Sequence, residues 1–484
     1  MGLGLRLGKN RFTSGEALPD VGHPAVTNGV LAGLGVGLWW LELEQGRFSI
    51  GVSSVLGWGA VLYIVAVGVI LTQRVDRWTM PIVLAVALAC QLQVVFAAPF
   101  LSTDVYRYVW DGVVQHAGIS PYRYVPGDAA LSFLRGPNAD VFANINRRDY
   151  AHTIYPPCAQ MLFYLVTWVS PTVTAMKLAM VGFEAVTVAA LIALLKSLGR
   201  RPAQVLLYAW CPLQVWEIAS SGHLDAAATA FIVLALLARM RERAWLTGVL
   251  LGTAVMLKFY PLVLLPALWW HGDGKGSWWK MPAGLAGVVA VGYACYASVG
   301  MRVFGFVDGY AQEEGLATGA RYFLLDLVRR APGMAAVPVW VFYGFCGAVF
   351  AGLGVWAWRV GSRPGSAFLG PAFGSCVALM LLFSPHYAWY VIWLVPFFAL
   401  RPNLAVLVYL MGFLCRFTTM WALPGPKIFV MNEWLYGATG VGYLVWMGWR
   451  RWAPMRKANT GTLHCIQDDG KTRARAGNGY LQRK

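Results

Sequence analysis

Long apolar runs, separated by short polar connections, occupy most of the chain between residues 27 and 449. They carry apolar residues on every face of a helix, which is typical of helices in a bilayer or inside a helical bundle. We therefore predict an all-α, polytopic integral membrane protein. The predicted spans are 27–42, 51–73, 78–101, 172–196, 203–221, 224–240, 244–257, 261–271, 281–300, 336–358, 366–384, 387–400, 403–422 and 434–449.

Several of these runs are shorter than the roughly 20 residues that a bilayer requires. We expect 244–257 and 261–271 to be broken or re-entrant helices around Lys258 and Pro261. The total is then about 12 to 14 transmembrane helices.

Composition excludes a soluble protein. Of the 484 residues, 58% are hydrophobic and 13% are charged, whereas about 25% are charged in soluble proteins. The formal net charge of +17 would also fit a nucleic-acid-binding protein. Many cations lie in short loops between apolar runs, however, and form no single basic face, so we expect membrane lipids as partners and no nucleic acid. The eight cysteines contain no C-x-x-C pair, which predicts neither a disulfide framework nor a zinc site.

Basic residues also predict the orientation of the spans. Arg and Lys concentrate in cytoplasmic loops, and each short loop that falls inside is basic when the N-terminus is placed in the cytoplasm. These residues are Arg6, Lys9, Arg11, Arg74, Arg77, Lys196, Arg200, Arg201, Arg239, Arg241, Arg243, Lys275, Lys280, Arg359, Arg363, Arg401, Arg450, Arg451, Arg456 and Lys457.

This topology divides the chain into three parts. Residues 1–26 form a cytoplasmic segment without a cleavable signal peptide, and 450–484 form a basic, disordered cytoplasmic tail. Between them, 27–449 form a domain in the plasma or inner membrane, with large extracytoplasmic loops at 102–171 and 301–335.

One apolar stretch must not cross the membrane if this topology holds. Residues 158–169 reach about 18 Å as a helix, which is short of a roughly 30 Å hydrocarbon core. Counting them as a span would also place the basic loop after residue 195 outside. We therefore predict a helix that begins at Pro156 and Pro157 and lies in the outer interface.

The stretch S-T-D-V-Y-R-Y-V-W-D-G at 102–112 predicts an amphipathic helix directly after a span. Ser102 or Thr103 is a suitable cap, and Asp104 suits the positive N-terminus. Asp104, Tyr108 and Asp111 share one face at i, i+4 and i+7. The face presents two carboxylates beside Arg107, which indicates either a chemical site or a surface Arg107–Asp111 pair with a capping Asp104.

These motifs and three later ones resemble the GT-C glycosyltransferases, and more narrowly the polyprenol-phosphate-mannose-dependent mannosyltransferases of glycosyltransferase family 87. The first block holds the acidic residue after a span, Y-R-Y, G-x-x-P-Y and Y-P-P. The later pieces are G-H-L-D at 222–225, K-F-Y-P at 258–261 and S-P-H-Y-A-W-Y at 384–390. The resemblance covers roughly residues 80–400 and implies a GT-C-type helical bundle.

The resemblance implies a hexosyltransferase that moves a sugar, with mannose as the expected one, from a polyprenyl-phosphate donor to a lipid or glycan acceptor. The reaction would occur outside the membrane with inversion, and Asp104 matches the family's general base. A positioned carboxylate takes the acceptor's hydroxyl proton as the glycosidic bond forms. Asp111 lies about 10 Å further along the helix, so we expect it to brace the helix.

The departing lipid phosphate requires fixed cations or a metal. No cofactor is indicated, although a divalent metal stays compatible with the sequence. Lys258 lies between apolar residues, where a charge costs roughly 2.5–3.5 kcal/mol in mid-membrane, so it requires a partner, a ligand or a path to the interface. His386 matches a histidine near the donor phosphate in the family. The predicted substrate-binding residues are Lys258, His386, Arg107, Tyr108, Asp111, His223, Asp225 and Tyr155.

Other cations and other functions remain open at this stage. Arg123, Arg147 and Arg148 lie in the first external loop, while Arg321 and Arg416 have no motif that supports a role. His223 and Asp225 either line the cavity or cap a helix. The alternatives to a glycosyltransferase are a flippase or transporter and a lipid-linked glycan ligase or polymerase. The absence of repeat symmetry and of midplane charges argues against a transporter.

The predicted topology has a direct test. A single cysteine introduced at position 128 should react with a membrane-impermeant reagent in intact cells, because loop 102–171 is expected outside. Labelling that requires cell lysis would reverse the topology and contradict an extracytoplasmic active site.

Overall fold

The computed structural model describes residues 22–47, 52–269, 278–422 and 429–451, and these ranges contain helices and connecting segments without a β-strand. The chain divides into two units, residues 1–400 and 401–484. The second unit contains α20 (Leu404–Ala422) and a helix over 429–451. The predicted all-α fold is confirmed. The N-terminal segment up to residue 21 and the tail beyond 451 lie outside the described residues.

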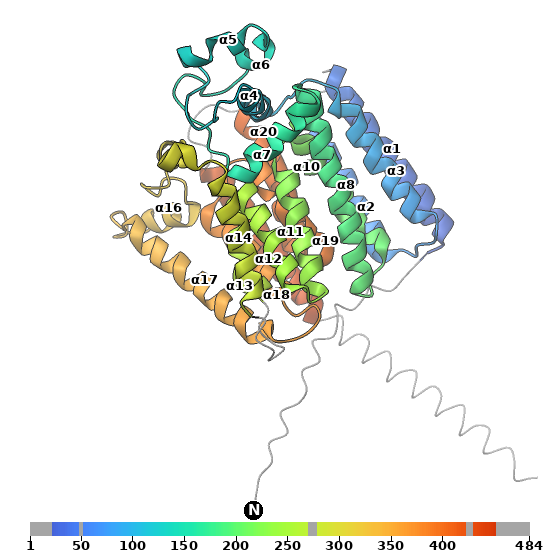
Figure 1. Cartoon of the computed structure of the whole chain (residues 1–484). Coiled ribbons are helices and arrows are strands. Elements are labelled where there is room, and N and C mark those ends of the chain that lie inside the picture. Colours follow the sequence, from blue (N-terminus) through green and yellow to red (C-terminus); the bar gives the residue numbers. More distant parts are fainter. Residues whose placement is uncertain (1–21, 48–51, 270–277, 423–428, 452–484) are drawn as a thin grey trace, which may run out of the picture. The chain divides into compact units, whose positions relative to one another are not determined.

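Helices of the first unit pack in a row in which each neighbour contacts the next (Figure 1). The first three helices pack together, α8 packs on α11, α11 on α12, and α12 on α14. Farther along the chain α17 packs on α18. The bounds are α1 Pro24–Arg47, α2 Val52–Thr72, α3 Thr79–Val95, α8 Val173–Ser197, α11 Asp225–Met240, α12 Ala244–Leu257, α14 Lys280–Ala294, α17 Val339–Gly361 and α18 Leu369–Phe383.

Four described helices are long and apolar enough to cross a membrane, and a fifth span results if one bent helix pair counts as one. The four are Pro24–Glu44, Ser54–Thr72, Val173–Ser197 and Val339–Gly361. Six further apolar helices have only 10–17 residues. The membrane class follows from these helices, whereas the expected total of about 12 to 14 spans stays a prediction.

Three predicted spans are interrupted. The run 203–221 is four short pieces: η2 (Pro202–Val205), α9 (Leu206–Ala209), α10 (Pro212–Gln214) and η3, a π-helix over Val215–Ser220. Pro212 explains one break, because proline has no N–H to continue a helix. The run 281–300 bends by 109° after α14, where η5 (Ala297–Phe304) begins.

The third interruption occurs where the sequence predicts it. Helix α12 ends at Leu257, Lys258 is extended, and the chain resumes as η4 (Tyr260–Leu264) and α13 (Leu265–Leu268). The extended backbone before Pro261 allows Lys258 to leave the helical surface and reach a neighbouring helix.

The segment 102–171 covers one end of the first unit (Figure 1). It contains α4 (Asp104–His116), η1 (Ala129–Leu131), α5 (Ser132–Arg135), α6 (Ala139–Ala143) and α7 (Pro157–Val169). The predicted helices after residue 102 and after Pro156 are confirmed, while the position of α7 relative to a membrane stays a prediction. Helix α7 packs closely on α4, since a Cβ on Gly112 would lie 2.3 Å from the Thr167 hydroxyl oxygen.

Segment 301–335 also contains helices. They are α15 (Val307–Glu313) and α16 (Phe323–Arg329), and they follow the bend after α14. The remaining elements, η6 (Ala388–Leu394) and α19 (Val395–Leu400), close the first unit.

Glycines set the spacing of α12 and α14. A Cβ on Gly248 would lie 2.0 Å from the Met281 carbonyl oxygen, and a Cβ on Gly284 would lie 2.7 Å from the Trp245 carbonyl oxygen. Gly252, one turn after Gly248, meets Leu285 at 3.1 Å. Small residues spaced four apart allow membrane helices to approach at backbone distance.

We expect Gly248→Val to separate α12 from α14 and to lower the thermal stability of the purified protein in detergent. Gly287→Val is the matched control, because a Cβ at Gly287 meets nothing within 4 Å. Since steric overlap with backbone cannot relax by a rotamer change, equal melting temperatures for the two variants would contradict the packing described.

Candidate active site

Asp104 is the first residue of α4 and is partly exposed. Its backbone N–H donates to the Ser102 hydroxyl at 3.2 Å, while Thr103 occupies the N-cap position without a side-chain capping bond. The Asn146 amide donates to the Asp104 carboxylate at 2.9 Å. Among the described residues no cation pairs with Asp104, so its carboxylate stays available to an incoming hydroxyl.

Lys177 fixes the end of α3 that leads toward Asp104. Its side chain is fully buried and donates to the carbonyls of Val94 at 3.1 Å and Ala97 at 2.6 Å. A Cβ on Gly222 would lie 2.9 Å from Val105 and 3.0 Å from the Lys177 side chain, and Gly222 has a φ of +76°. The start of α4 is therefore held against the turn that carries His223.

The second carboxylate of α4 differs from Asp104. Asp111 is buried and accepts from Arg107 Nε at 2.8 Å and from Gln160 Nε2 at 2.9 Å. Arg107 also donates to the Ala151 carbonyl at 3.1 Å. The Arg107–Asp111 pair that the sequence allowed is present, but it is buried and not at the surface. Asp111 and Arg107 join α4 to the loop and to α7, which is the bracing role expected of Asp111.

Tyr108 and Tyr155 form an aromatic cluster under α4. The Tyr108 ring stacks on Phe163 with centroids 4.6 Å apart and meets Tyr155 edge-on at 4.9 Å. Both tyrosines are buried. Their position supports the helix that carries Asp104, and neither ring lies open to a substrate in this structure.

A buried ion pair joins α11 to the end of α12. Lys258 Nζ lies 2.6 Å from Asp225 Oδ2, and the Tyr260 hydroxyl donates to the other Asp225 oxygen at 3.4 Å. The Asp225 side chain is fully buried. Asp225 is the first residue of α11 and pairs with a lysine, so the expectation that it caps the helix is wrong; the cap position belongs to Leu224.

His223 belongs to a second buried pair. Its Nε2 lies 3.4 Å from Glu217 Oε2, and both side chains are fully buried. Glu217 is part of the π-helix η3, a form of helix that occurs often at functional sites. The His223 ring stacks on Trp389 with centroids 4.3 Å apart.

A group of charged and aromatic side chains lies beside these pairs. Glu314 forms an ion pair with Arg321 and lies 3.5 Å from His386 Nδ1. The Tyr390 ring is 5.9 Å from the Arg321 guanidinium carbon and 5.4 Å from Lys258 Nζ. Tyr390 and Tyr310 share a hydrogen bond at 2.6 Å. We call Glu314, Arg321, His386 and Tyr390 the cation cluster.

The two large loops meet next to this cluster. Arg147 pairs with Glu313 at 2.8 Å, and the Tyr150 hydroxyl donates to the same carboxylate at 3.1 Å. Arg147 directly follows Asn146, the partner of Asp104, and Glu313 directly precedes Glu314. A continuous series of contacts therefore connects Asp104 to the cation cluster.

The charge of Glu314 is favoured by its neighbours. Burial raises the pKa of this carboxyl, but the hydrogen bond with His386 and the positive charge of Arg321 outweigh burial and lower the pKa below its ordinary value of 4.5. A charged Glu314 holds Arg321 and His386 in place. The guanidinium and the imidazole are thereby presented from two distant parts of the chain.

Sequence reasoning missed Glu314 and Glu217, and it noticed Arg321 without assigning it a role. Arg321 lies in a segment without a recognised motif. The one signal for it in the sequence is a positive charge in a loop outside the predicted spans. Of the other loop cations, Arg148 lies 5.1 Å from the Phe142 ring and Arg123 is exposed, so neither is part of the cation cluster. Arg416 lies in the second unit, 4.8 Å from the Phe413 ring.

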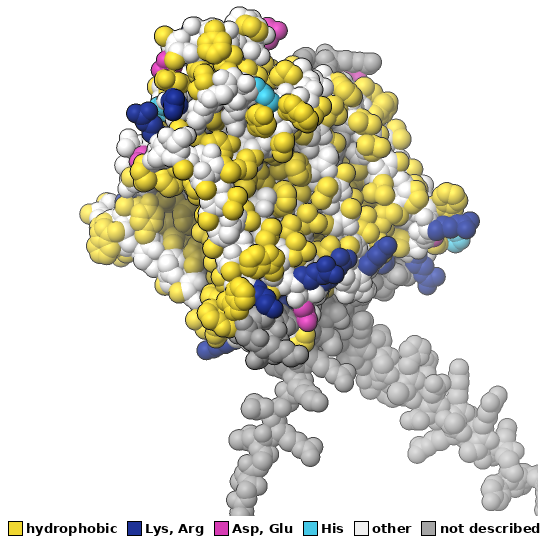
Figure 2. Space-filling model, in the orientation of Figure 1, with side chains coloured by type: hydrophobic (Ala, Val, Ile, Leu, Met, Phe, Trp, Pro, Cys, Tyr) yellow, Lys and Arg dark blue, Asp and Glu magenta, His cyan; other side chains and the backbone are white. Residues whose placement is uncertain are grey.

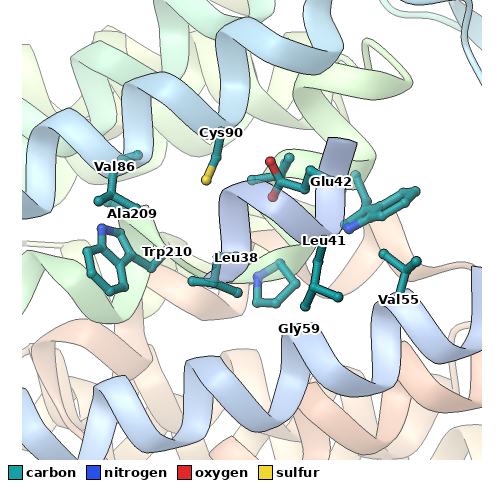
Figure 3. Close-up of a pocket in the computed structure, with 13 residues that line it drawn as sticks. Leu38, Leu41, Glu42, Val55, Gly59, Val86, Cys90, Ala209 and Trp210 are labelled. Atoms are coloured by element: carbon teal, nitrogen blue, oxygen red, sulfur yellow. The ribbon is translucent and has the colours of Figure 1, made fainter. Parts of the chain in front are cut away.

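No metal site is found within the described ranges. There, no group of three or more His, Cys, Asp or Glu side chains could hold a metal ion. The cavity in Figure 3 lies elsewhere, between the first three helices and residues 209–216. Its volume of about 20 Å³ holds at most about one water molecule, and apart from Glu42 its lining is mainly apolar. It is too small for a sugar.

The ion pair of Lys258 predicts a stability effect. Lys258→Met should lower the unfolding free energy by about 3–5 kcal/mol, because it leaves a buried carboxylate without its partner. The double variant Lys258→Met with Asp225→Asn should recover much of that loss. Thermal unfolding of both in detergent tests this; a single variant as stable as the wild type would show that Lys258 is not a structural partner.

A comparison with protein families identifies the family of the chain. Residues 20–272, more than half of the chain, match the model of the MptA_B family, described as an alpha-(1->6)-mannopyranosyltransferase N-terminal domain. No curated protein matches. The matched range contains Asp104, Glu217, His223, Asp225 and Lys258, while the cation cluster lies beyond it. The resemblance to family 87 mannosyltransferases is confirmed, and the chain belongs to the MptA_B mannosyltransferase family as a multi-pass membrane protein.

Proposed function

We propose that this membrane mannosyltransferase transfers mannose from a polyprenyl-phosphate donor to a hydroxyl of a lipid or glycan acceptor, on the extracytoplasmic side and with inversion. The family description supports an α-(1→6) linkage as the product. The observation that carries the proposal is the continuity between Asp104 and the cation cluster. One acceptor-activating carboxylate and a pair of phosphate-binding cations come from three separate segments of the chain and surround Tyr387.

The position of the charges supports the extracytoplasmic side. Asp104 and Asp225 lie where α4 and α11 begin, whereas Lys196 and Arg239 lie in the last turns of α8 and α11. Figure 2 shows Lys and Arg side chains along the lower side of the view, away from the α4–α6 segment, and a smaller group beside that segment. Since basic loops favour the cytoplasm, the end that carries Asp104 faces outward.

Asp104 is the proposed general base. Its carboxylate takes the proton of the acceptor hydroxyl while the hydroxyl oxygen bonds to C1 of mannose, and the bond from C1 to the phosphate oxygen breaks. The electron pair of the breaking bond leaves with the lipid phosphate. Attack opposite the leaving phosphate inverts the configuration at C1, and a single carboxylate is sufficient for this step.

Arg321 and His386 are the proposed partners of the departing phosphate. Charge develops on the phosphate oxygen in the transition state, and fixed cations in a water-poor site stabilise it. Lys258 has the partner that its apolar surroundings require, because Asp225 binds its ammonium at 2.6 Å. Its charge acts on the site through the Tyr390 ring, and its main role is to join α11 and α12.

The isoprenoid chain of the donor requires an apolar path beside the cation cluster. Only 11% of the residues in the apolar stretch of α17 are buried. The helix exposes Trp340, Phe345 and Trp356. In Figure 2 the surface is hollowed between the α16–α17 region and the centre of the first unit. A lipid chain lying there would bring its phosphate toward Arg321, which immediately precedes Tyr322 and α16.

The general base is tested with purified protein and a polyprenyl-phosphate-mannose donor. Asp104→Asn should lower turnover by about 10²–10⁴-fold, because it removes the proton acceptor, and donor binding should change little. The matched control Asp140→Asn removes an exposed carboxylate of the same segment and should keep wild-type turnover. Near-normal turnover of Asp104→Asn would place the base elsewhere. A wild-type protein that moves the lipid across the membrane without transfer would favour a flippase.

A further inference from the structure

Three rings form a parallel stack that runs outward from the buried Glu217. His223 stacks on Trp389 with centroids 4.3 Å apart, and Trp389 stacks on Tyr387 at 4.4 Å with an interplanar angle of 6°. His223 is fully buried, Trp389 is 9% exposed, and Tyr387 is partly exposed. One face of Tyr387 thus lies on Trp389. In the described part of the chain no second ring is stacked in parallel on the other face.

The stack is held at its inner end. His223 Nε2 lies 3.4 Å from Glu217 Oε2, and Gly222 packs against Val105 and Lys177. A residue whose ring is fixed by packing and by a buried polar partner presents the next ring in a defined orientation. Tyr387 is therefore the outermost member of a rigid arrangement and not a freely rotating side chain.

Tyr387 also lies near both chemical parts of the site, Asp104 and the cation cluster. It follows His386 directly, and its ring centroid is 6.2 Å from that of Tyr390, a member of the cation cluster. Glu314, Arg147, Arg321 and Asp104 are all within electrostatic range of its hydroxyl. An aromatic face at this place is adjacent to any group located between the general base and the phosphate.

We propose that the outer face of Tyr387 is the platform for the transferred mannosyl ring and stabilises its positive charge in the transition state. This inference rests on the proposed function. In an inverting transfer the bond to the phosphate breaks as the bond to the acceptor oxygen forms, and the acceptor's proton moves to Asp104. The ring between them acquires oxocarbenium character.

The chemistry of an aromatic face suits this task. A cation within about 6 Å of a tyrosine face is stabilised by roughly 0.5–2 kcal/mol. The stabilisation is greater for the charged transition state than for the neutral sugar, so it raises kcat more than it lowers KM. A mannosyl ring also presents apolar C–H groups, which pack on an aromatic surface. Tyr387 thereby acts as a specificity-determining residue for a pyranose ring.

The experiment compares three replacements at position 387 in the purified full-length protein with the polyprenyl-phosphate-mannose donor. Tyr387→Phe keeps the electron-rich face and should retain kcat within about 3-fold. Tyr387→Leu should lower kcat by roughly 3- to 30-fold with a smaller change in donor KM. Pentafluorophenylalanine at position 387 has nearly the same shape with an electron-poor face, and it should lower kcat as leucine does.

The outcomes separate this inference from the function on which it rests. The platform is supported if kcat of Tyr387→Phe stays near the wild-type value while kcat of the pentafluorophenylalanine variant falls to about that of Tyr387→Leu. Equal kcat for all three variants overturns it, as does a loss that follows ring size alone, which indicates packing. An inactive wild-type protein instead contradicts the proposed function. Thermal melting of each variant shows whether the fold is retained. If Tyr387→Leu unfolds, the test rests on the comparison of phenylalanine with pentafluorophenylalanine, which have nearly the same shape.

Discussion

A charge inside an apolar helical bundle must have a partner, and this constraint organises the structure. An unpaired charge would cost several kcal/mol, and two of the buried ion pairs in the described part of the first unit also connect neighbouring segments. Lys258 meets Asp225 across α12 and α11, and Arg107 with Asp111 joins α4 to the loop and to α7. These pairs place the ends of the helices relative to one another, and the site occupies those ends.

The same constraint separates structural from chemical groups. Asp111 lies 2.8 Å from a guanidinium nitrogen and Asp225 lies 2.6 Å from an ammonium nitrogen. Asp104 instead accepts a hydrogen bond at 2.9 Å from the neutral amide of Asn146. A carboxylate whose oxygens already bind a lysine or an arginine inside the protein has no free oxygen to offer to an incoming hydroxyl. Of these three acids, Asp104 alone keeps both partial exposure and an unpaired charge. Its suitability as a base thus depends on where the cations are used.

Much of the fold was predictable because its signals are local. Apolar runs identified the principal helices, Pro156 and Pro157 marked the start of α7, and Lys258 with Pro261 marked the break after α12. The interruption of 203–221 was not predictable from hydropathy, since a π-helix and short helical turns have the same apolar composition as a continuous span. The partners of Asp111 and Lys258 were also partly predictable, because the first pair is local and a lysine among apolar residues requires an acid.

The rest of the site depends on contacts over long sequence separations. Arg321 and Glu314 carry no motif, and their meeting with His386 arises from the bend after α14 and the return of the chain at residue 384. Glu217 was hidden in an apparently apolar run, where it is part of the π-helix η3 and lies 3.4 Å from His223. Local patterns identify the groups that can react, whereas tertiary pairing decides which of them remain able to do so. In the described part of this mannosyltransferase the pairing leaves Asp104 without a cation and one face of Tyr387 without a ring stacked on it.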